Sequence, residues 1–391
     1  MRENMASGGI GAPLSGAQVG AILFAGVAGI LFAGVGPYLL GGLEAAGRIS
    51  PGQLGQAGTA ELLTMGIAAG LTGPIWGLHR LRLLTLICGL SMATLNIASI
   101  WTDGWTIILV RGANGIPSGA LIWLMTAMIV RSARPERWAA IYLTAQGLAQ
   151  GLIVVALGAL GDGPTGLAIG FGSLGAIGIA TCAAAVLMPM ALAPLPVDPD
   201  QPIGRPSVRG LVALAAGFAF NAGILAVWIY VDPLSRQAGH PIGTASLAFS
   251  FSLFAQVAGG TVATFTAERL STTLALIVSL LGLAAAMAAM GTLPSATLFL
   301  IIATVFGFIW MFSSPFYTPL VIAADPTRRS AAYGSGVAIL GCSAGPFLAS
   351  LVVSDSDVRS SISLGLALLA VSLAIVVGLA LKKANKLVTD A

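Results

Sequence analysis

Arg111, Asn114 and Ser118 are polar residues inside a long apolar stretch, and their spacing suits them to bind a solute. Their intervals of three and four residues, which also include Gly115, place them on one face of a helix. A charge near the middle of a membrane helix costs at least about 2.5–3.5 kcal/mol on insertion scales, so Arg111 requires compensation. A planar guanidinium can bind a carboxylate or phosphate group. It can also tie its helix to carbonyl groups of a neighbour, and both interpretations stay open.

Two further helical faces combine aromatic rings with hydrogen-bonding groups. They consist of Asn221, Trp228 and Asp232, and of Trp310, Ser313, Ser314 and Tyr317. Such rings can stack on a flat or apolar solute, although packing or an interfacial belt is the alternative for Trp228. Trp310 lies near the middle of its apolar stretch, which favours a cavity. The spacing therefore nominates both faces as candidate solute-binding surfaces.

Pro315 follows two serines in the tenth apolar stretch. Proline removes a backbone donor and serine hydroxyls can satisfy the freed carbonyls, so a gating bend or a tolerated kink is expected there. Gln256 is a further candidate solute-binding residue, although a hydrogen bond between helices explains it equally well.

Carboxylates that could couple transport to protons are few. Glu61 is expected about one turn inside its helix, where burial favours proton exchange, and Asp232 and Glu44 are expected near the outer surface. The alternative for Glu61 and Asp232 is that they simply face water. No catalytic constellation is visible, because His79 and His240 are expected on opposite sides of the membrane. No phosphate-binding Gly-Lys-Ser/Thr loop is present either, so neither an enzyme nor ATP drive is expected.

The composition identifies the solvent of this chain as a lipid bilayer. Of 391 residues, 57% are hydrophobic and 8% are charged, against roughly 25% charged in soluble domains. The 51 glycines suit closely packed membrane helices. The net charge of +4 comes from scattered basic residues and is no nucleic-acid footprint, and the three cysteines lack metal-ligand spacing.

Twelve stretches approach the roughly 20 apolar residues that span a bilayer. They are residues 17–40, 57–78, 83–101, 105–130, 138–160, 165–190, 209–232, 243–266, 272–290, 295–320, 331–352 and 361–381. The segment 191–208 begins with a run rich in Pro and Asp that cannot continue a helix. It is expected to be a cytoplasmic linker between a domain at 1–190 and a domain at 209–391.

Basic residues predict the orientation of these stretches. With the N-terminus inside, fourteen of the 18 Lys and Arg residues fall in inner loops and tails, three fall in outer loops, and Arg111 lies in the membrane. We therefore expect a multi-pass protein of the cell (inner) membrane with both termini in the cytoplasm.

The two halves of the chain repeat each other. Pro, Arg, Ala and Tyr match in register between ARPERWAAIY at 133–142 and ADPTRRSAAY at 324–333, where Pro326 follows Pro135 by 191 residues. A weaker match joins His79-Arg80-Leu81 to Glu268-Arg269-Leu270. Six-helix halves related as parallel repeats place a solute site between them near the middle of the membrane.

These residues resemble the major facilitator superfamily of secondary transporters over essentially the whole chain. RGANGIPSG at 111–119 resembles its fourth-helix motif, and GCSAGP at 341–346 resembles its Gly-Pro packing motif. The resemblance implies an all-α membrane fold of twelve helices in two pseudo-symmetric six-helix bundles, with helices one, four, seven and ten lining a central cavity. It also implies gating roles for charged residues of the inner loops, namely Arg80, Arg137, Glu268, Arg269 and Arg328.

The chain departs from the family pattern in two places. Gly77 stands where the loop between helices two and three usually has Asp, which weakens the expected charge relay in the first half. The segment QGLAQG at 146–151 lacks the proline that marks many antiporters. This absence makes a multidrug exporter the less favoured interpretation.

The sequence therefore predicts a secondary transporter of a small organic solute that works by alternating access and is coupled to protons or another ion. Since no buried acid is expected beside Arg111, the predicted solute is an organic or aromatic carboxylate. The alternatives are a proton-driven exporter of hydrophobic or cationic drugs, and a non-transporting receptor or assembly factor. No cofactor, metal or nucleic acid is expected, and the protein is predicted to act as a monomer in the bilayer.

Overall fold

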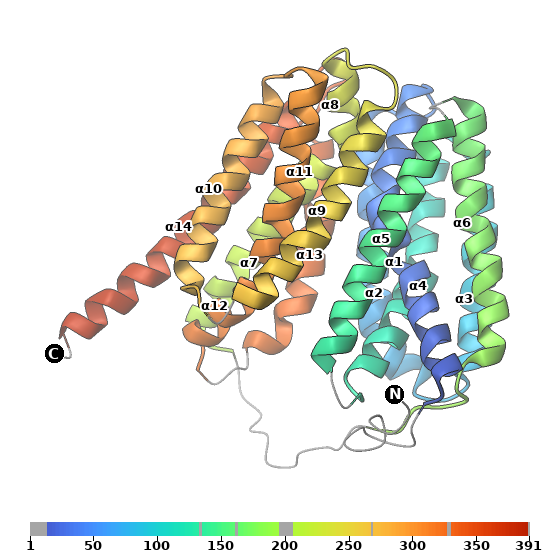
Figure 1. Cartoon of the computed structure of the whole chain (residues 1–391), viewed down its shortest axis with the longest axis horizontal. Coiled ribbons are helices and arrows are strands. Elements are labelled where there is room, and N and C mark those ends of the chain that lie inside the picture. The colour runs from blue at the N-terminus through green and yellow to red at the C-terminus, as the bar shows by residue number, and fades with distance from the viewer. Residues whose placement is uncertain are drawn as a thin grey trace. The chain divides into compact units, whose positions relative to one another are not determined.

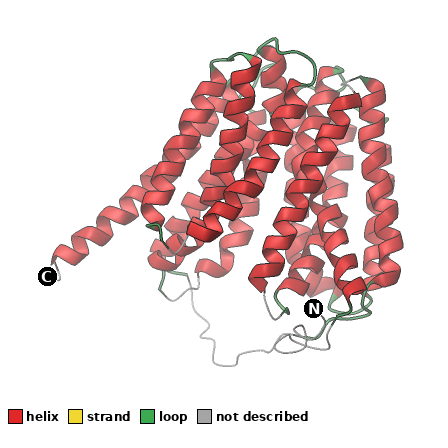
Figure 2. Ribbon diagram, viewed as in Figure 1, coloured by secondary structure: helices red, strands yellow, loops and turns green. Residues whose placement is uncertain are grey.

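Helices joined by short loops form the described part of the chain (Figures 1 and 2). The computed structural model describes residues 14–132, 135–160, 163–194, 206–266, 269–326 and 330–389. Within these ranges, ten helical segments are long and apolar enough to cross a membrane. The protein is therefore an all-α, multi-pass membrane protein. The predicted stretches at 57–78 and 331–352 are also helical, but the first is less apolar and the second contains a shorter apolar helix.

The helices follow the predicted stretches in order. The first six are α1 (Gly16–Ala45), α2 (Pro51–Trp76), α3 (Leu81–Ala98), α4 (Gly104–Ile129), α5 (Pro135–Leu160) and α6 (Pro164–Ala184), followed by the 3₁₀ turn η2 (Ala185–Leu187). The remaining elements are α7 (Val208–Trp228), α8 (Val231–Gln237), α9 (Thr244–Thr266), α10 (Thr272–Gly291), α11 (Ala296–Ser313), η3 (Ser314–Phe316), α12 (Tyr317–Ala324), η4 (Ser330–Tyr333), α13 (Gly334–Ser350) and α14 (Ser360–Thr389).

Local hydrogen bonds explain where several helices begin. At α2, the Ser50 hydroxyl accepts from the Gln53 backbone N–H at 3.2 Å, and the Gln53 side chain accepts from the Ser50 N–H at 3.0 Å. This reciprocal capping box satisfies two donors that the first turn of a helix leaves unpaired. Ser15 and Gln18 form the same arrangement at α1. The box starts α2 before its apolar stretch, so Glu61 lies nearly three turns inside the helix rather than one.

The chain divides into two compact units, which we call the first unit and the second unit. The first comprises Met1–Leu39 and Ala60–Pro202, and the second comprises Leu40–Thr59 and Ile203–Ala391. The boundary after Pro202 falls within the predicted linker at 191–208. Residues 40–59, from the end of α1 to the first part of α2, belong to the second unit.

The two units have similar internal packing. In the first unit α3 packs against α4 and α6, and in the second α10 packs against α11 and α14. Glycines bring the backbones of α2 and α4 together in the first unit, and Gly307 brings α11 against Ser252 of α9 in the second. This correspondence is what the sequence repeat predicts for two related halves.

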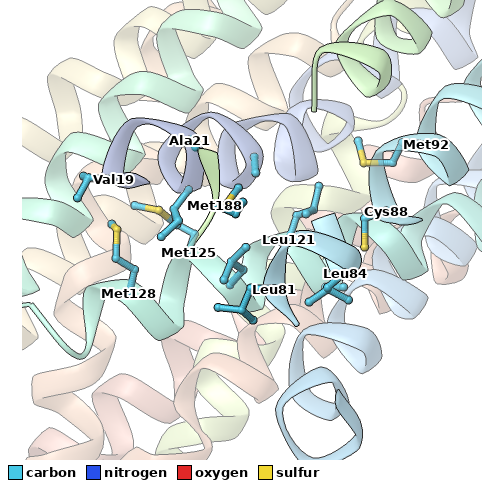
Figure 3. Close-up of a cluster of buried hydrophobic side chains, with 14 residues drawn as sticks. Val19, Ala21, Leu81, Leu84, Cys88, Met92, Leu121, Met125, Met128 and Met188 are labelled. Carbon is cyan, nitrogen blue, oxygen red and sulfur yellow. The ribbon is translucent and has the colours of Figure 1, made fainter. Parts of the chain in front are cut away.

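A hydrophobic core underlies the first unit (Figure 3). It is built from α1, α3 and α4, together with Met188 after α6. Four of its members are methionines, whose flexible thioether side chains fill irregular spaces between helices. The cluster fixes α3 and α4, the two helices that carry most of the polar residues described below.

Two predicted spans contain breaks. Helix α7 ends at Trp228, and α8 starts at Val231, so the prediction that Asp232 shares one helical face with Asn221 and Trp228 is wrong. Pro233 explains this break, because it has no N–H for the carbonyl four residues earlier. The tenth span is interrupted by the 3₁₀ turn at Ser314–Phe316, which contains Pro315. Both breaks occur at prolines within otherwise apolar runs.

Candidate functional site

Three glycines of α4 bring this helix unusually close to α2. A Cβ added at Gly115 would collide with the Thr64 hydroxyl and the Glu61 carbonyl, and one added at Gly119 would collide with the carbonyl of Met65. The Thr64 hydroxyl donates to the carbonyl of Gly112 at 2.7 Å. Such contact between backbones needs residues without side chains and allows polar groups on the two helices to meet.

Arg111 uses this close approach to reach Glu61. Its Nε donates to Glu61 Oε2 and its Nη2 donates to Oε1, both at 2.7 Å, so guanidinium and carboxylate meet fork to fork. The amide of Asn114 donates to the same Oε1 at 2.8 Å. Nη1 of Arg111 donates to Asn96 Oδ1 at 3.0 Å and to Ser99 Oγ at 3.1 Å. Four of the five guanidinium N–H groups thus have partners.

The pair is sealed from solvent. The side chains of Arg111 and Glu61 are both 0% exposed. The guanidinium carbon lies 3.8 Å from the centroid of the Phe32 ring and 5.9 Å from that of Phe171. A buried cation gains from an aromatic face, and a buried ion pair tolerates burial only when its remaining groups are hydrogen-bonded. These contacts offset the cost of burying the Arg111 charge within the membrane.

This geometry corrects two expectations. The prediction that no buried acid lies beside Arg111 is wrong, because Glu61 is its direct partner. The alternative that Glu61 faces water is also wrong. Glu61 was not recognised as the partner because it lies 50 residues away in the sequence. The glycines at 112, 115 and 119 were the available signal that α4 touches another helix.

Ser118 lies one turn beyond Asn114 on the same helix. It is 1% exposed, and its hydroxyl has no hydrogen-bond partner among the described residues. It lines a small cavity of about 10 Å³ together with Asn96 and Asn114. The predicted face of Arg111, Asn114 and Ser118 therefore exists, and it points into the interior of the first unit.

In the second unit, Trp228 and Trp310 belong to one aromatic cluster. The Trp228 ring lies edge-on to that of Trp310 at 5.7 Å and to that of Phe249 at 4.8 Å between centroids. Phe306 adds a further edge contact to Trp310 at 6.2 Å. Trp228 is only 1% exposed, so it packs in the interior of this unit instead of forming an interfacial belt.

The bend at Pro315 is stabilised by the two serines before it. The hydroxyls of Ser313 and Ser314 donate to the carbonyl of Trp310 at 3.0 and 2.9 Å, and the backbone N–H of Ser314 reaches the same carbonyl. Proline has no N–H to continue the helical ladder here, and the two hydroxyls add further hydrogen bonds to the Trp310 carbonyl in the turn before it.

A pocket of about 260 Å³ lies beside this bend, within the second unit. The predicted residues Asn221, Ser314 and Tyr317 all line it. The sequence did not identify the others, which are Ala213, Leu214, Gly217, Phe220, Thr318, Val321, Ala331, Gly334, Val337 and Ala338. Most of these are small or apolar and carry no signal of a site. None of the lining residues that the structure describes is charged.

Comparison with solved structures reveals the fold. The chain superimposes on the nucleoside transporter NupG with a TM-score of 0.67 at 11% identity, covering 93% of this chain and 98% of that one. A D323A mutant of NupG gives 0.68 at 12% identity with the same coverage. The human organic anion transporter MFSD10 gives 0.59 at 15% identity, covering 92% of this chain and 99% of that one. The chain has the major facilitator superfamily fold. No protein-family model and no curated protein sequence matches it.

The Gly-Pro motif at 341–346 lies in α13 and packs this helix against α7. A Cβ at Gly341 would meet the carbonyl of Phe218, and one at Gly345 would meet that of Ala222. The motif therefore presses α13 against α7. This contact helps to set the spacing of two of the helices that line the pocket.

Asp232 lies in α8, among residues at the end of α1. Its Oδ2 accepts from Arg236 Nε at 3.2 Å, and Arg236 also contacts the carboxylate of Glu44 and the carbonyl of Gly41. A Cβ at Gly41 would collide with the Asp232 carboxylate. Asp232 is 5% exposed and already paired with a cation, so it is a weaker candidate for proton exchange than the sequence suggests.

The other predicted residues are distributed as follows. Gln256 is 8% exposed, and its Nε2 lacks a hydrogen-bond partner among the described residues. Arg80 is the N-cap of α3 in a left-handed conformation with φ 56°, and Arg80, Arg137 and Arg269 are all exposed. Glu268 and Arg328 lie outside the described residues.

Backbone hydrogen bonds hold the loop between α2 and α3, which contains Arg80. Leu81 N–H donates to the Met190 carbonyl at 3.3 Å and Leu192 N–H donates to the Leu78 carbonyl at 2.9 Å. Nearby, Arg131 Nε donates to the carbonyl of Ala193 at 2.6 Å. The first two bonds join the loop between α2 and α3 to the segment after α6, and the third joins the end of α4 to the same segment.

Proposed function

We propose that this protein is a secondary transporter that moves a small organic solute across the membrane by alternating access and is driven by protons. The fold supports transport, because its solved relatives in structure are a nucleoside transporter and an organic anion transporter. One fold hosts many activities, so the proposal also needs a feature of this chain. That feature is the buried pair of Glu61 and Arg111.

Protonation of Glu61 would change the charge of this site. With Glu61 ionised, the pair is neutral overall and all its oxygens and most of its N–H groups are satisfied. With Glu61 protonated, Arg111 remains as a buried cation without a counter-charge, a state that costs several kcal/mol. The protein can lower this cost by moving to a conformation in which water or another group reaches the guanidinium. Proton binding to Glu61 would thereby shift the equilibrium between two conformations of the transporter.

The organic carboxylate predicted from the sequence becomes the competing hypothesis on solute class. Its main support was an unpaired Arg111, and the guanidinium instead makes two hydrogen bonds with Glu61. An anion would have to displace that carboxylate. We therefore favour a solute that is uncharged where it contacts the second unit, because the described residues that line the pocket of this unit are all uncharged.

The orientation and assembly predicted from the sequence complete the proposal. The excess of basic residues in the predicted inner loops supports cytoplasmic termini, and we propose that the protein lies in the cell (inner) membrane. We propose that a single chain suffices for transport, since each unit holds its own part of the polar machinery. Labelling of single engineered cysteines in the loops from either side of intact cells tests the orientation.

The test of function is solute flux in proteoliposomes. Purified protein is reconstituted and offered radiolabelled solutes of several classes, with and without an imposed pH gradient. We expect accumulation of at least one solute only when the gradient is present. Glu61→Gln should abolish gradient-driven accumulation, whereas Asp355→Asn, a change of an exposed acid in an outer loop, should leave it intact. Equal accumulation by Glu61→Gln and the parent protein would contradict proton coupling through Glu61.

A further inference from the structure

The pocket of the second unit has an aromatic wall whose geometry is fixed. The rings of Phe220 and Tyr317 lie 4.7 Å apart between centroids at an angle of 37°. The Tyr317 hydroxyl hydrogen-bonds to Ser372 Oγ at 2.9 Å, and Ser372 donates to the carbonyl of Ala216 at 2.9 Å. The polar end of Tyr317 is therefore engaged by α14 and α7, and its ring serves the pocket as an apolar surface.

Gly217 keeps space open beside this wall. A Cβ added there would lie 3.5 Å from Cδ1 of Tyr317, which is an ordinary van der Waals contact. The position therefore tolerates alanine, while a larger side chain would extend into the pocket that Gly217 lines. Gly217 thus offers a graded way to reduce the volume of the pocket without touching its polar groups.

Asn221 supplies the main polar group of the lining. Its Nδ2 donates to the carbonyl of Gly217 at 2.8 Å, and its Oδ1 lies 3.7 Å from Cys342 Sγ, the distance of a weak hydrogen bond. A primary amide has two N–H groups and two acceptor lone pairs. With respect to the described residues, one N–H and one lone pair of Asn221 remain for a ligand. An amide in this state matches a partner that offers an adjacent N–H and C=O.

The size and charge of the pocket restrict that partner further. Its volume of about 260 Å³ exceeds the roughly 150 Å³ of a cavity that holds benzene, and it is below the range of about 300–1,000 Å³ for drug-sized ligands. A single ring with small substituents fits these limits. The lining residues within the described part of the chain carry no charge, so a full charge on the ligand would be costly to bury beside them.

We propose that this pocket binds an uncharged, planar heterocyclic ring that carries a lactam-type N–H next to a carbonyl, with Asn221 pairing to that edge and the ring lying against Tyr317, whose own ring packs on the buried Phe220. This inference rests on the proposed transport function, because it names the solute class of that transporter. Free nucleobases and nucleosides both offer such an edge, with an N–H next to a carbonyl. Because the two differ in size, binding experiments can distinguish them.

The experiment measures binding to purified full-length protein without any transport step. The probes are uracil, uridine, 1,3-dimethyluracil and benzoate, tested by calorimetry or by ligand-dependent shifts in melting temperature. We expect uracil or uridine to bind, 1,3-dimethyluracil to bind about tenfold or more weakly because its N–H is blocked, and benzoate not to bind. Binding of uridine but not uracil would assign a nucleoside, and the reverse would assign a base. Equal binding of uracil and 1,3-dimethyluracil, or binding of benzoate alone, would overturn the proposal.

Variants locate the binding in this pocket. Asn221→Ala should weaken binding of the N–H-bearing probe about tenfold or more. Gly217→Val should weaken it by filling the pocket, with Gly217→Ala as an intermediate that folds without a clash. Gly172→Val in α6, where an added Cβ meets no atom within 4 Å, is the matched control. Unchanged binding in a folded Gly217→Val protein would contradict the assignment. Binding without gradient-driven flux would instead contradict the transport proposal, so the two can fail separately.

Discussion

Glu61 and Arg111 meet through two hydrogen bonds of 2.7 Å, although they lie 50 residues apart on α2 and α4. Both side chains are fully buried, and Asn114 and Asn96 complete the hydrogen bonding of the pair. An arrangement of this kind is fragile, because each partner is acceptable in the interior only while the other is present.

Removing one partner of the pair should cost more stability than removing both. Arg111→Ala leaves the Glu61 carboxylate buried and uncompensated, and a loss of about 3–5 kcal/mol is expected for such a change. The double variant Glu61→Leu with Arg111→Met replaces the pair by apolar side chains of similar length and should recover most of that loss. Melting temperatures in detergent measure the difference. A double variant less stable than either single variant would show that the pair contributes net stability.

The closeness of α2 and α4 depends on Gly115. Valine at this position would place its side chain against the Thr64 hydroxyl and the backbone of Glu61, so the helices must separate and stretch the hydrogen bonds of Arg111. We expect Gly115→Val to lose at least about 1–3 kcal/mol, the usual effect of overpacking. Gly70→Val is the control on α2, since a Cβ there meets no atom within 4 Å. Similar melting temperatures for both variants would contradict the role of Gly115.

Sequence reasoning predicted the helical face of α4 but not what it faces. Periodicity placed Arg111, Asn114 and Ser118 together, because a helix repeats every 3.6 residues whatever surrounds it. The partner of Arg111 is a tertiary contact, which periodicity does not encode. The position of Glu61 was also misjudged, because apolar residues begin near 57 while the capping box at Ser50 starts the helix earlier. The sequence therefore predicts Glu61 about one turn inside its helix, whereas it lies nearly three turns inside.

The pocket of the second unit could also be predicted only in part from the sequence. Asn221, Ser314 and Tyr317 were visible as polar or aromatic residues within apolar runs, and the structure brings them to one pocket. The wall supplied by α13 was not predicted, since Gly334, Val337 and Ala338 are indistinguishable by type from residues that face lipid. The breaks before α8 and after α11 moved Asp232 away from Asn221 but kept Ser314 and Tyr317 beside the pocket.

Asp232 and Glu61 should differ in their effect on coupling. Asp232 is paired with Arg236, which also contacts Glu44, so protonation of Asp232 leaves Arg236 with another counter-charge. Asp232→Asn is therefore expected to retain gradient-driven accumulation, whereas Glu61→Gln should lose it. Counterflow, which needs no gradient, is the companion measurement for both variants. Loss of accumulation in Asp232→Asn with intact counterflow would assign the coupling role to Asp232 instead.

The loop between α13 and α14 should loosen in acid. Hydrogen bonds from the Arg359 side chain, then from Gln237 and the Arg359 backbone, hold the pKa of the Asp357 carboxyl well below its usual range. A depressed pKa contributes stability above the unfolded pKa of about 4, and this contribution is lost as the pH falls through and below that value. The protection factors of residues 354–359, which correct for the intrinsic slowing of exchange in acid, should fall below about pH 4. Asp357→Asn should remove that dependence while leaving exchange in α14 unchanged.

The bend at Pro315 should matter for transport more than for stability. Alanine at 315 restores a backbone N–H and allows α11 to run on into α12, so Pro315→Ala should stabilise the helix or leave its stability unchanged. If the bend permits a conformational change, counterflow should slow in this variant while binding of solute persists. Pro319 provides the control, because it lies in the first turn of α12, beyond the 3₁₀ turn that interrupts the span. Pro319→Ala should therefore transport normally, and an equal slowing in both variants would indicate that the bend has no special role.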